Sequence, residues 1–252
     1  MALIGHDTKA VLLVGGKGTR LRFVISSTPK PMAALGNRPF LELLVRQLSC
    51  QGIRHLVMCT GYLSHEIENE LGDGHTWDIA IEYSKEPYPL GTAGAVKFAE
   101  PLLRGVSDFL VMNGDSFIEM DFPQLIRFHR ESGGLASMAV LRIQNDMRYG
   151  TVQMDARGRV NGFAEKIGSE PSGLVNAGVY VFNREIFEHI PEGPASLEKD
   201  IFPQLLARGV YASEQQGVFI DIGTPEDYAR AQGLCGRLYE AASRKRAPGS
   251  SS

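Results

Sequence analysis

The sequence predicts an α/β fold built on a doubly wound, mixed, mostly parallel sheet. Short apolar runs, each of strand length, recur along the first half of the chain, and segments with helical spacing separate them. These runs are apolar throughout, which is typical of strands covered by helices on both faces. The 252 residues and the hydrophobic content of 43% suffice for one sizeable core. The alternation of strand and helix therefore favours parallel strands joined by helical crossovers.

The first half of the fold, residues 9–115, contains four expected strands. They lie at residues 9–14, 55–61, 79–84 and 108–115. Helices are expected between them at residues 39–52, at residues 64–72 and, after a glycine loop, within residues 91–103. Gly52 is expected to end the first of these helices, and Ser64 is expected to cap the second.

The second half, residues 116–240, is richer in strands. Helices are expected at residues 121–134, where Asp121 is the cap, at residues 196–209 and from Thr224 onward. Strands are expected at residues 135–143, 149–155, 159–165, 176–183 and 217–223, with a hairpin turn at residues 156–158. The strands before residue 184 should extend the sheet and form a β-rich lid over one edge. Residues 1–240 are expected to form one domain, and residues 241–252 a disordered polar tail.

Charge and composition exclude several classes of protein. A formal net charge of −3 gives no global basic field that would attract nucleic acid or an anionic membrane. No apolar run approaches the ~18 residues of a membrane span, and the amino terminus lacks the pattern of a signal peptide. Three cysteines without a C-x-x-C spacing indicate reduced thiols in a cytoplasmic protein. The six histidines form no pair with the spacing of zinc ligands.

The segment LLVGGKGTRLR, residues 12–22, carries three glycines directly after the first expected strand. Glycine lets backbone N–H groups approach a phosphate closely, and arginine adds a permanently charged fork for phosphate oxygens. A nucleotide polyphosphate fits both features, although a solvated turn is the alternative for this loop taken alone. The Walker pattern is excluded because Lys17 precedes Gly18, and the dinucleotide pattern fails because Leu21 replaces its third glycine.

A second cationic motif, STPKPM, holds Lys30 between two prolines that stiffen the backbone around it. Together, G-G-x-G-T-R-L and P-K-P resemble the signature of the sugar-phosphate nucleotidylyltransferases from Lys9 to about Gly233. The segment PLGTAGA, residues 89–95, is similar to the guanylyltransferase branch of that family. Within this branch, the chain resembles enzymes that act on D-glycero-α-D-manno-heptose 1-phosphate.

This resemblance implies a Rossmann-like nucleotidyltransferase fold with a sugar-binding lid. It also implies Mg²⁺-dependent transfer of GMP from GTP to heptose 1-phosphate, which gives GDP-heptose and pyrophosphate. Arg20 would contact the triphosphate, and Lys30 would neutralise the α-phosphate as charge builds up during the reaction. The nucleotide-binding residues would be Leu12, Gly15, Gly16, Lys17, Gly18, Thr19, Thr92, Ala93 and Gly94.

Two aspartates from distant parts of the chain are expected to hold one Mg²⁺. Asp115 follows a buried strand, at the end of the sheet where open α/β folds bind their ligands. Asp221 lies at the end of the last expected strand, and Thr224 and Pro225 then suit the start of a helix. Carboxylate oxygens are the hard ligands that Mg²⁺ prefers. An ordinary aspartate at a strand end is the alternative for Asp115 alone.

The sugar phosphate is expected in the second half. By resemblance, its surroundings are the Y-G, E-K and N-A-G segments, which supply Gly150, Glu165, Lys166 and Asn176. Glu165 could accept hydrogen bonds from sugar hydroxyls, and Lys166 could pair with the phosphate. The family's usual proline after E-K is Ile167 here, and its usual tryptophan before D-I-G-T-P is Phe219. These departures leave the identity of the sugar open.

Other functions remain open at this point. A mannose or glucose 1-phosphate nucleotidylyltransferase is the nearest alternative. A non-catalytic sensor of nucleotide sugars is disfavoured, because a sensor needs neither the paired aspartates nor both cations. The oligomeric state is also open, with a homodimer as one arrangement.

Overall fold

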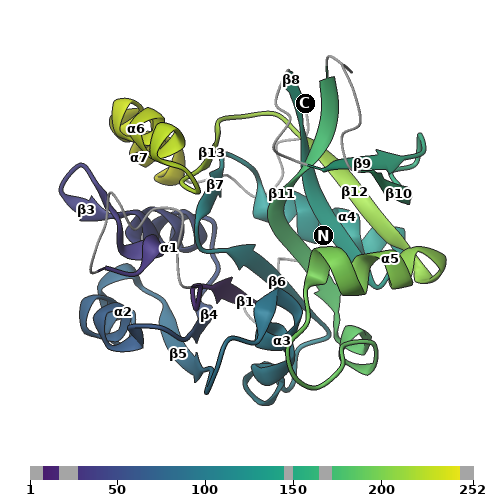
Figure 1. The fold of residues 1–252 in the computed structure, drawn as a ribbon, viewed down its shortest axis with the longest axis horizontal. Helices are drawn as coiled ribbons and strands as arrows, with labels where there is room; N and C mark the ends of the chain where they lie inside the picture. Colours follow the sequence, from purple (N-terminus) through teal and green to yellow (C-terminus); the bar gives the residue numbers. More distant parts are fainter. Residues whose placement is uncertain (1–7, 17–27, 145–149, 165–171, 245–252) are drawn as a thin grey trace.

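The computed structural model describes residues 8–16, 28–144, 150–164 and 172–244, and its centre is one mixed β-sheet (Figure 1). Four strands from the first half run parallel in the order β6-β1-β4-β5. They are β1 (Lys9–Leu13), β4 (His55–Thr60), β5 (Ala80–Lys85) and β6 (Asp108–Asn113). The four strands expected in the first half are therefore confirmed.

The second half of the chain extends this sheet, as expected. β11 (Ser172–Asn183) runs antiparallel to β6 and to β8 (Ala136–Gln144), and β8 pairs in parallel with β12 (Val210–Gln215). β9 (Thr151–Met154) and β10 (Val160–Ala164) form the expected hairpin, and β9 pairs with β11. The sheet is mixed, and the predicted fold class is confirmed.

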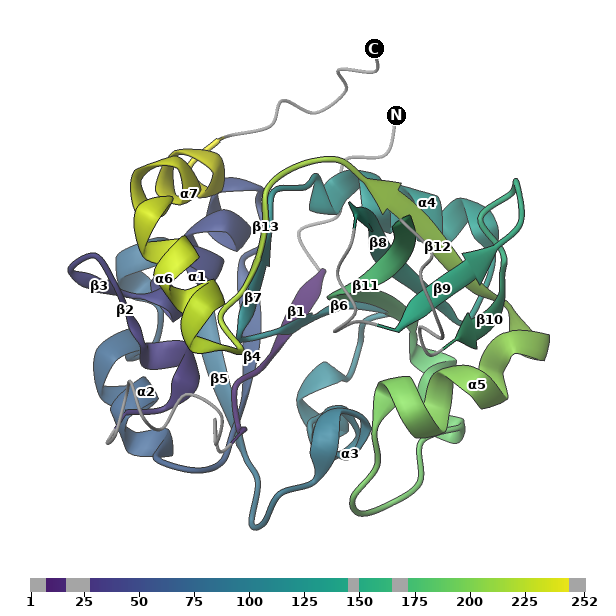
Figure 2. The same cartoon turned by 45° about the horizontal axis from the view of Figure 1, so that its top comes forward.

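Helices cover both faces of the sheet (Figure 2). The helices α1 (Phe40–Cys50), α2 (Ser64–Leu71) and α4 (Phe122–Ser132) contribute to one buried apolar core, and α3 (Gly91–Phe98) and α5 (Phe202–Leu205) contribute to another. Within β1, Leu12 belongs to the first core and Val11 to the second. Both faces of the strand are therefore apolar, which explains its unbroken hydrophobic run.

The order of the parallel strands creates a point where the chain reverses direction across the sheet. From β1 the chain moves outward through β4 to β5, and it then returns to place β6 on the other side of β1. In open α/β sheets, ligands bind outside the carboxyl ends of the strands at such a switch point. The segments after β1 and β6 are the glycine loop and the turn that carries Asp115.

Several expected helices differ in detail. Ser64 is the first residue of α2 and does not cap it, because the cap position falls on Leu63 in a left-handed conformation. Gly91 already belongs to α3, so no glycine loop precedes that helix. The helix expected at residues 196–209 divides into a π turn (Leu197–Ile201), α5 and a 3₁₀ turn (Leu206–Arg208). Pro203 has no N–H group to continue a regular helix there.

The carboxyl-terminal region also differs from the prediction. Two helices, α6 (Pro225–Gly233) and α7 (Cys235–Ala242), replace one continuous helix. Because α7 reaches Ala242 and buries that residue, the predicted tail begins two residues too early. Four strands are not predicted by the sequence: β2 (Ala34–Leu35), β3 (Arg38–Pro39), β7 (Ser116–Ile118) and β12.

Two local expectations, the cap of α4 and the burial of Cys59, are confirmed. The Asp121 side chain caps α4 by accepting a hydrogen bond of 2.9 Å from the Gln124 N–H. The three cysteines are free thiols, and Cys59 is buried in the core. Within the described ranges, every helix is too short or too polar to cross a bilayer.

A buried histidine makes the stability of the fold depend on pH. His129 of α4 is 3% exposed, and its Nδ1 atom lies 2.9 Å from the Ser137 hydroxyl of β8. Burial lowers the pKa of His129 to about 4, with a smaller opposing effect of Asp108. The unfolded chain, with a histidine pKa of about 6.5, binds the proton first as the pH falls. Protonation therefore favours unfolding between about pH 6.5 and pH 4.

We expect the free energy of unfolding to fall across this pH window, and to fall less steeply in His129→Gln. Urea unfolding of both proteins at several pH values measures the two slopes. The carboxylates titrate in both proteins, so the difference between the slopes isolates the histidine. Equal slopes would contradict the prediction.

Candidate active site

Asp115 is positioned by a turn that only glycine can make. β6 ends at Asn113, and the Gly114 N–H donates to the Leu13 carbonyl at 3.0 Å. A Cβ atom on Gly114 would lie 2.5 Å from Val14 Cγ1 and 2.8 Å from the Leu13 carbonyl oxygen. Such contacts are too close for any side chain, so glycine lets the end of β6 approach the end of β1. Asp115 follows directly, beside the switch point.

Asp221 reaches the same place through a short two-stranded sheet. β13 (Phe219–Asp221) pairs antiparallel with β7, and this register sets Asp221 opposite Ser116. The Ile222 N–H donates to the Asp115 carbonyl oxygen at 2.9 Å. Thr224 then caps α6 by accepting from the Asp227 N–H at 3.2 Å, as the sequence predicts. Strand pairing and helix capping together fix the backbone that carries Asp221.

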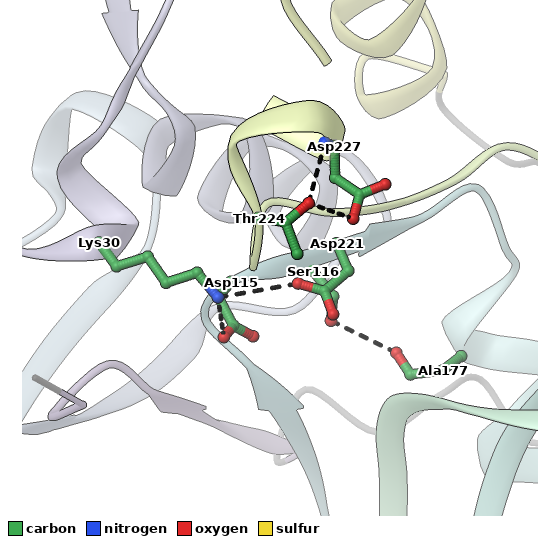
Figure 3. A network of polar contacts seen from close by, with 7 residues as sticks. All are labelled: Lys30, Asp115, Ser116, Ala177, Asp221, Thr224 and Asp227. Atoms are coloured by element: carbon green, nitrogen blue, oxygen red, sulfur yellow. Dashed lines mark hydrogen bonds and ion pairs between the residues drawn. The ribbon is translucent and has the colours of Figure 1, made fainter. Parts of the chain in front are cut away.

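Lys30 contacts both carboxylates (Figure 3). Its Nζ atom lies 2.6 Å from Asp115 Oδ2 and 3.7 Å from Asp221 Oδ1. The two carboxylate oxygens are therefore separated by no more than the sum of these distances. Only 12% of the Lys30 side chain is exposed, so its charge is poorly screened by solvent. The structure brings together the three charged residues that the sequence assigns to this centre.

The two prolines that flank Lys30 restrict its backbone, as the sequence suggests. Lys30 begins a 3₁₀ turn that ends at Met32, and the Met32 N–H donates to the Pro29 carbonyl oxygen at 2.8 Å. Pro29 and Pro31 are both buried. The backbone below Lys30 is thus fixed by ring geometry and by packing, which limits the positions that its ammonium group can reach.

The donor set suits a small hard cation. The Lys30 ammonium group already stands between the two carboxylates, which shows that the site attracts positive charge. Among the described residues, no group of three or more His, Cys, Asp or Glu side chains could hold a metal ion. A metal at this position would have Asp115 and Asp221 as its protein ligands and would need further oxygens from water or substrate. Mg²⁺ commonly binds in this way, through one or two carboxylates and phosphate oxygens.

The nucleotide-binding residues expected after β1 are only partly described. Leu12 is buried within β1, while Gly15 and Gly16 follow that strand. No atom of the described residues lies within 4 Å of a Cβ atom placed on Gly16. Four further residues assigned to the triphosphate lie outside the described residues: Lys17, Gly18, Thr19 and Arg20.

The residues expected at the start of α3 contact another part of the protein. The Ala93 and Gly94 N–H groups donate to the Ala195 carbonyl oxygen at 2.9 and 3.3 Å. A Cβ atom on Gly94 would lie 2.3 Å from the Gly193 carbonyl oxygen, so this close packing requires glycine. The small residues of this segment therefore have a structural role. Their contact with the nucleotide stays a prediction.

A pocket of about 210 Å³ lies beside the two aspartates. It brings Asp115 and Asp221 together with two residues predicted to contact the sugar phosphate, Gly150 and Asn176. Glu165 and Lys166 lie outside the described residues. Ala177 and Gly178, which complete the predicted N-A-G segment, also line the pocket. The remaining lining residues were not predicted for the site: Asn113, Ser116, Tyr180, Glu198 and Phe219. The pocket is polar near the aspartates and large enough for a small ligand.

A chain of hydrogen bonds crosses this pocket. The Asn176 amide donates to the Tyr180 hydroxyl at 2.8 Å, and that hydroxyl donates to Glu198 Oε1 at 3.0 Å. Glu198 Oε2 accepts from the Thr92 hydroxyl at 2.9 Å. Burial raises the pKa of Tyr180 well above its usual value, and the negative charge of Glu198 adds to this effect. The tyrosine hydroxyl therefore keeps its proton and acts as a donor.

Glu198 was not predicted for the site, because the helical pattern of residues 196–209 already accounts for an acidic residue at that position. The available signal was an acidic residue in the first turn of a helix that Pro203 must interrupt. Glu198 indeed lies in the π turn before α5, and such turns are frequent at functional sites.

The fold and the site define a nucleotide-binding α/β protein whose charged centre is suited to phosphate chemistry. Residues 9–235 match the model of the nucleotidyl transferase family, and the chain belongs to that family.

Among its relatives, mannose-1-phosphate guanylyltransferase of Mycobacterium tuberculosis is 39% identical over 229 residues, which is 89% of this chain. The match spans 64% of that relative, so the chain covers less than two thirds of its length. HddC of Yersinia pseudotuberculosis superposes with a TM-score of 0.80 at 32% identity, over 92% of this chain and 99% of HddC. HddC has also been solved in complex with GMP-PN, and that structure gives the same TM-score at 31% identity.

The Tyr180 hydroxyl is predicted to stabilise the fold. In Tyr180→Phe, Asn176 loses its acceptor and Glu198 loses a donor inside a buried network. We expect the free energy of unfolding to fall by about 1–3 kcal/mol, as measured by urea denaturation. Tyr211→Phe is the matched control, because the Tyr211 hydroxyl makes no hydrogen bond to a described residue. Equal losses in the two variants would contradict this role.

Proposed function

We propose that the protein transfers GMP from GTP to a sugar 1-phosphate and releases pyrophosphate. The observation that carries this proposal is the convergence of Asp115, Asp221 and Lys30 beside the end of β1 and a polar pocket. The guanylyltransferase relative and the GMP-PN complex of HddC support guanine as the base. Residues 9–115 would bind the nucleotide and residues 116–240 the sugar phosphate. Because the proposed substrates are nucleotides and the cysteines are free, we infer a cytoplasmic location.

In the proposed reaction, a phosphate oxygen of the sugar 1-phosphate attacks the α-phosphorus of GTP. A new phosphorus–oxygen bond forms as the bond between the α-phosphorus and the bridging oxygen of pyrophosphate breaks. The obstacle is electrostatic, since one anion must approach another. Positioning and neutralisation of charge should therefore provide most of the catalysis, without a covalent enzyme intermediate.

Counting the charges at the centre indicates why a metal ion is needed. Asp115 and Asp221 contribute two negative charges and Lys30 one positive charge, so the described residues alone leave the centre negative. A polyphosphate would be repelled by such a site. When Mg²⁺ is bound by the two aspartates, it would polarise the α-phosphate and orient the attacking oxygen. Lys30 would then be free to neutralise charge that develops on the phosphate.

The sugar would occupy the pocket beside Asp115. Asn176 can donate and accept hydrogen bonds, and Glu198 can accept them from hydroxyl groups. We infer D-glycero-α-D-manno-heptose 1-phosphate as the substrate, in agreement with the sequence resemblance. The relative from Mycobacterium tuberculosis favours mannose 1-phosphate as the second candidate.

A panel of substrates tests the proposal directly. The protein is incubated with Mg²⁺ and each pairing of GTP, ATP, CTP, UTP or dTTP with mannose, glucose or heptose 1-phosphate, and pyrophosphate is measured. We expect release with GTP and the heptose substrate. Release only with a hexose 1-phosphate would overturn the heptose assignment, and no release with any pair would favour a nucleotide-sugar sensor.

Loss of either aspartate is predicted to stop turnover without unfolding the protein. In Asp115→Asn and Asp221→Asn, the amide removes a negative metal ligand, and we expect pyrophosphate release to fall by at least ~10²-fold. Asp78→Asn is the control, because the Asp78 side chain is 84% exposed. Circular dichroism reports the fold. Undiminished turnover in Asp115→Asn would remove this residue from the metal site.

Lys30→Gln is predicted to act on the chemical step. The amide is polar but uncharged, so it cannot neutralise charge on the phosphate. We expect kcat to fall by ~10²–10³-fold while nucleotide binding, measured by calorimetry, changes much less. A loss confined to KM would show that Lys30 serves ground-state binding instead.

A further inference from the structure

The two aspartates of the charged centre are held by a sheet that is too small to be stable alone. β7 and β13 have three residues each and form a two-stranded sheet of their own. Isolated sheets of two strands are marginally stable at best in water. Each strand also has an outer edge whose backbone groups need hydrogen-bond partners. Contacts from outside the sheet must therefore hold it in place.

Glutamine side chains from α1 close the outer edge of β7. The Gln47 amide donates to the Ile118 carbonyl oxygen at 2.8 Å. Gln51, at the end of α1, donates to the Met120 carbonyl oxygen at 2.9 Å and accepts from the Phe122 N–H at 2.9 Å. Both glutamines are buried, and their spacing along the chain places them on one face of the helix. Their amides take the place of the neighbouring strand that this edge lacks.

An arginine from α6 closes the outer edge of β13. Arg230 Nη2 donates to the Phe219 carbonyl oxygen at 2.6 Å. Phe219 and Ile118 face each other in the strand register, so Arg230 and Gln47 bind the outward carbonyl groups of one residue pair. The small sheet is thus held from both sides, within the same short strands that lead to Asp115 and Asp221.

The chemistry of Gln47 indicates that its donor is needed. The Gln47 Oε1 atom is buried and has no hydrogen-bond partner among the described residues. An unpaired buried amide oxygen is costly, and an apolar side chain of similar shape would avoid this cost. A glutamine at this position is therefore explained by its bond to Ile118, which an apolar side chain could not make.

We propose that Gln47 and Arg230 are positioning residues, which keep Asp115 and Asp221 at the separation that a shared Mg²⁺ requires. The inference rests on the proposed function, because it takes the two aspartates as metal ligands. Each positioning residue acts through the backbone of the strand that it holds. When one of these bonds is lost, β7 and β13 can shift and the carboxylates converge less well. Mg²⁺ demands near-ideal octahedral geometry, so its affinity is sensitive to such a shift.

The competing explanation is that these bonds only stabilise the fold. Gln47→Met keeps the length of the side chain but removes its donor, and Arg230→Met does the same at an exposed position of α6. Ile67→Val is the control for lost stability, because Ile67 is buried on α2 in the same core as β7. Arg237→Met is the control for a lost arginine, because Arg237 is exposed on α7 and makes no hydrogen bond to a described residue.

Metal affinity is measured by titrating each protein with Mn²⁺ and following the free ion by electron paramagnetic resonance. Asp115→Asn identifies the Mn²⁺ that binds at the aspartates. We expect the dissociation constant of this Mn²⁺ to rise about 10-fold in Gln47→Met and in Arg230→Met, the low end for residues that orient metal ligands. Ile67→Val and Arg237→Met should bind Mn²⁺ as the unmodified protein does. Circular dichroism verifies folding, and Arg230→Met keeps the test decisive if Gln47→Met does not fold.

Turnover provides a second readout. Pyrophosphate release by the two variants should need about 10-fold more Mg²⁺ to reach half its maximal rate, while kcat at saturating Mg²⁺ is largely retained. A failure of the unmodified protein to release pyrophosphate would reject the proposed transfer but leave Mn²⁺ affinity to decide on Gln47 and Arg230. The inference would be overturned by an unchanged Mn²⁺ affinity in either folded variant or by an equal loss in Ile67→Val. Mn²⁺ binding that Asp115→Asn does not weaken would overturn it as well.

Discussion

The site depends on the repulsion between two carboxylates that the fold forces together. Pairing of β7 with β13 brings Asp221 opposite Ser116, next to Asp115, and the backbone bond from Ile222 to Asp115 closes this arrangement. Two like charges at such a separation are costly unless a cation lies between them. Lys30 supplies that cation in the structure, from a segment that its flanking prolines hold rigid. The strand ends, the Gly114 turn and the cap of α6 all serve to place these three side chains.

A second polar network connects this centre to the two halves of the fold. The hydrogen bonds run from Thr92 at the start of α3, through Glu198 and Tyr180, to Asn176 in β11. Their partners come from both sides of residue 115, so the predicted nucleotide and sugar halves share one buried set of contacts. Networks of this kind specify a single arrangement because each group left without a partner is costly. The distance between the two proposed substrates is thus set by the scaffold and not by a flexible connection.

The sequence carries a clear signal for parts of this architecture and almost none for others. Buried parallel strands appear as unbroken apolar runs, and Asp121 and Thr224 are recognisable helix caps, because these features depend on local physics. β7 has only three residues, too few to show the alternation of a strand, so its pairing with β13 is not predicted. The proximity of Asp115 and Asp221 is predicted only from their shared role as metal ligands. Glu198 was missed for a related reason: its role comes from contacts with Thr92 and Tyr180, which are distant in sequence. Tertiary pairing, and not local propensity, defines these positions.

The arrangement of charges corresponds to the chemistry of a nucleotide sugar. Such a product has an anionic diphosphate at its centre, between a base and a sugar that both present hydrogen-bond donors. On the proposal made above, Glu198 accepts donors at the sugar end, while Lys30 and a metal ion neutralise the phosphates. Reversing the charge of any of these groups would replace an attraction to the substrate with a repulsion. Recognition of the sugar and catalysis at the phosphates therefore arise from one electrostatic pattern, in which an acidic acceptor lies beside a cationic centre.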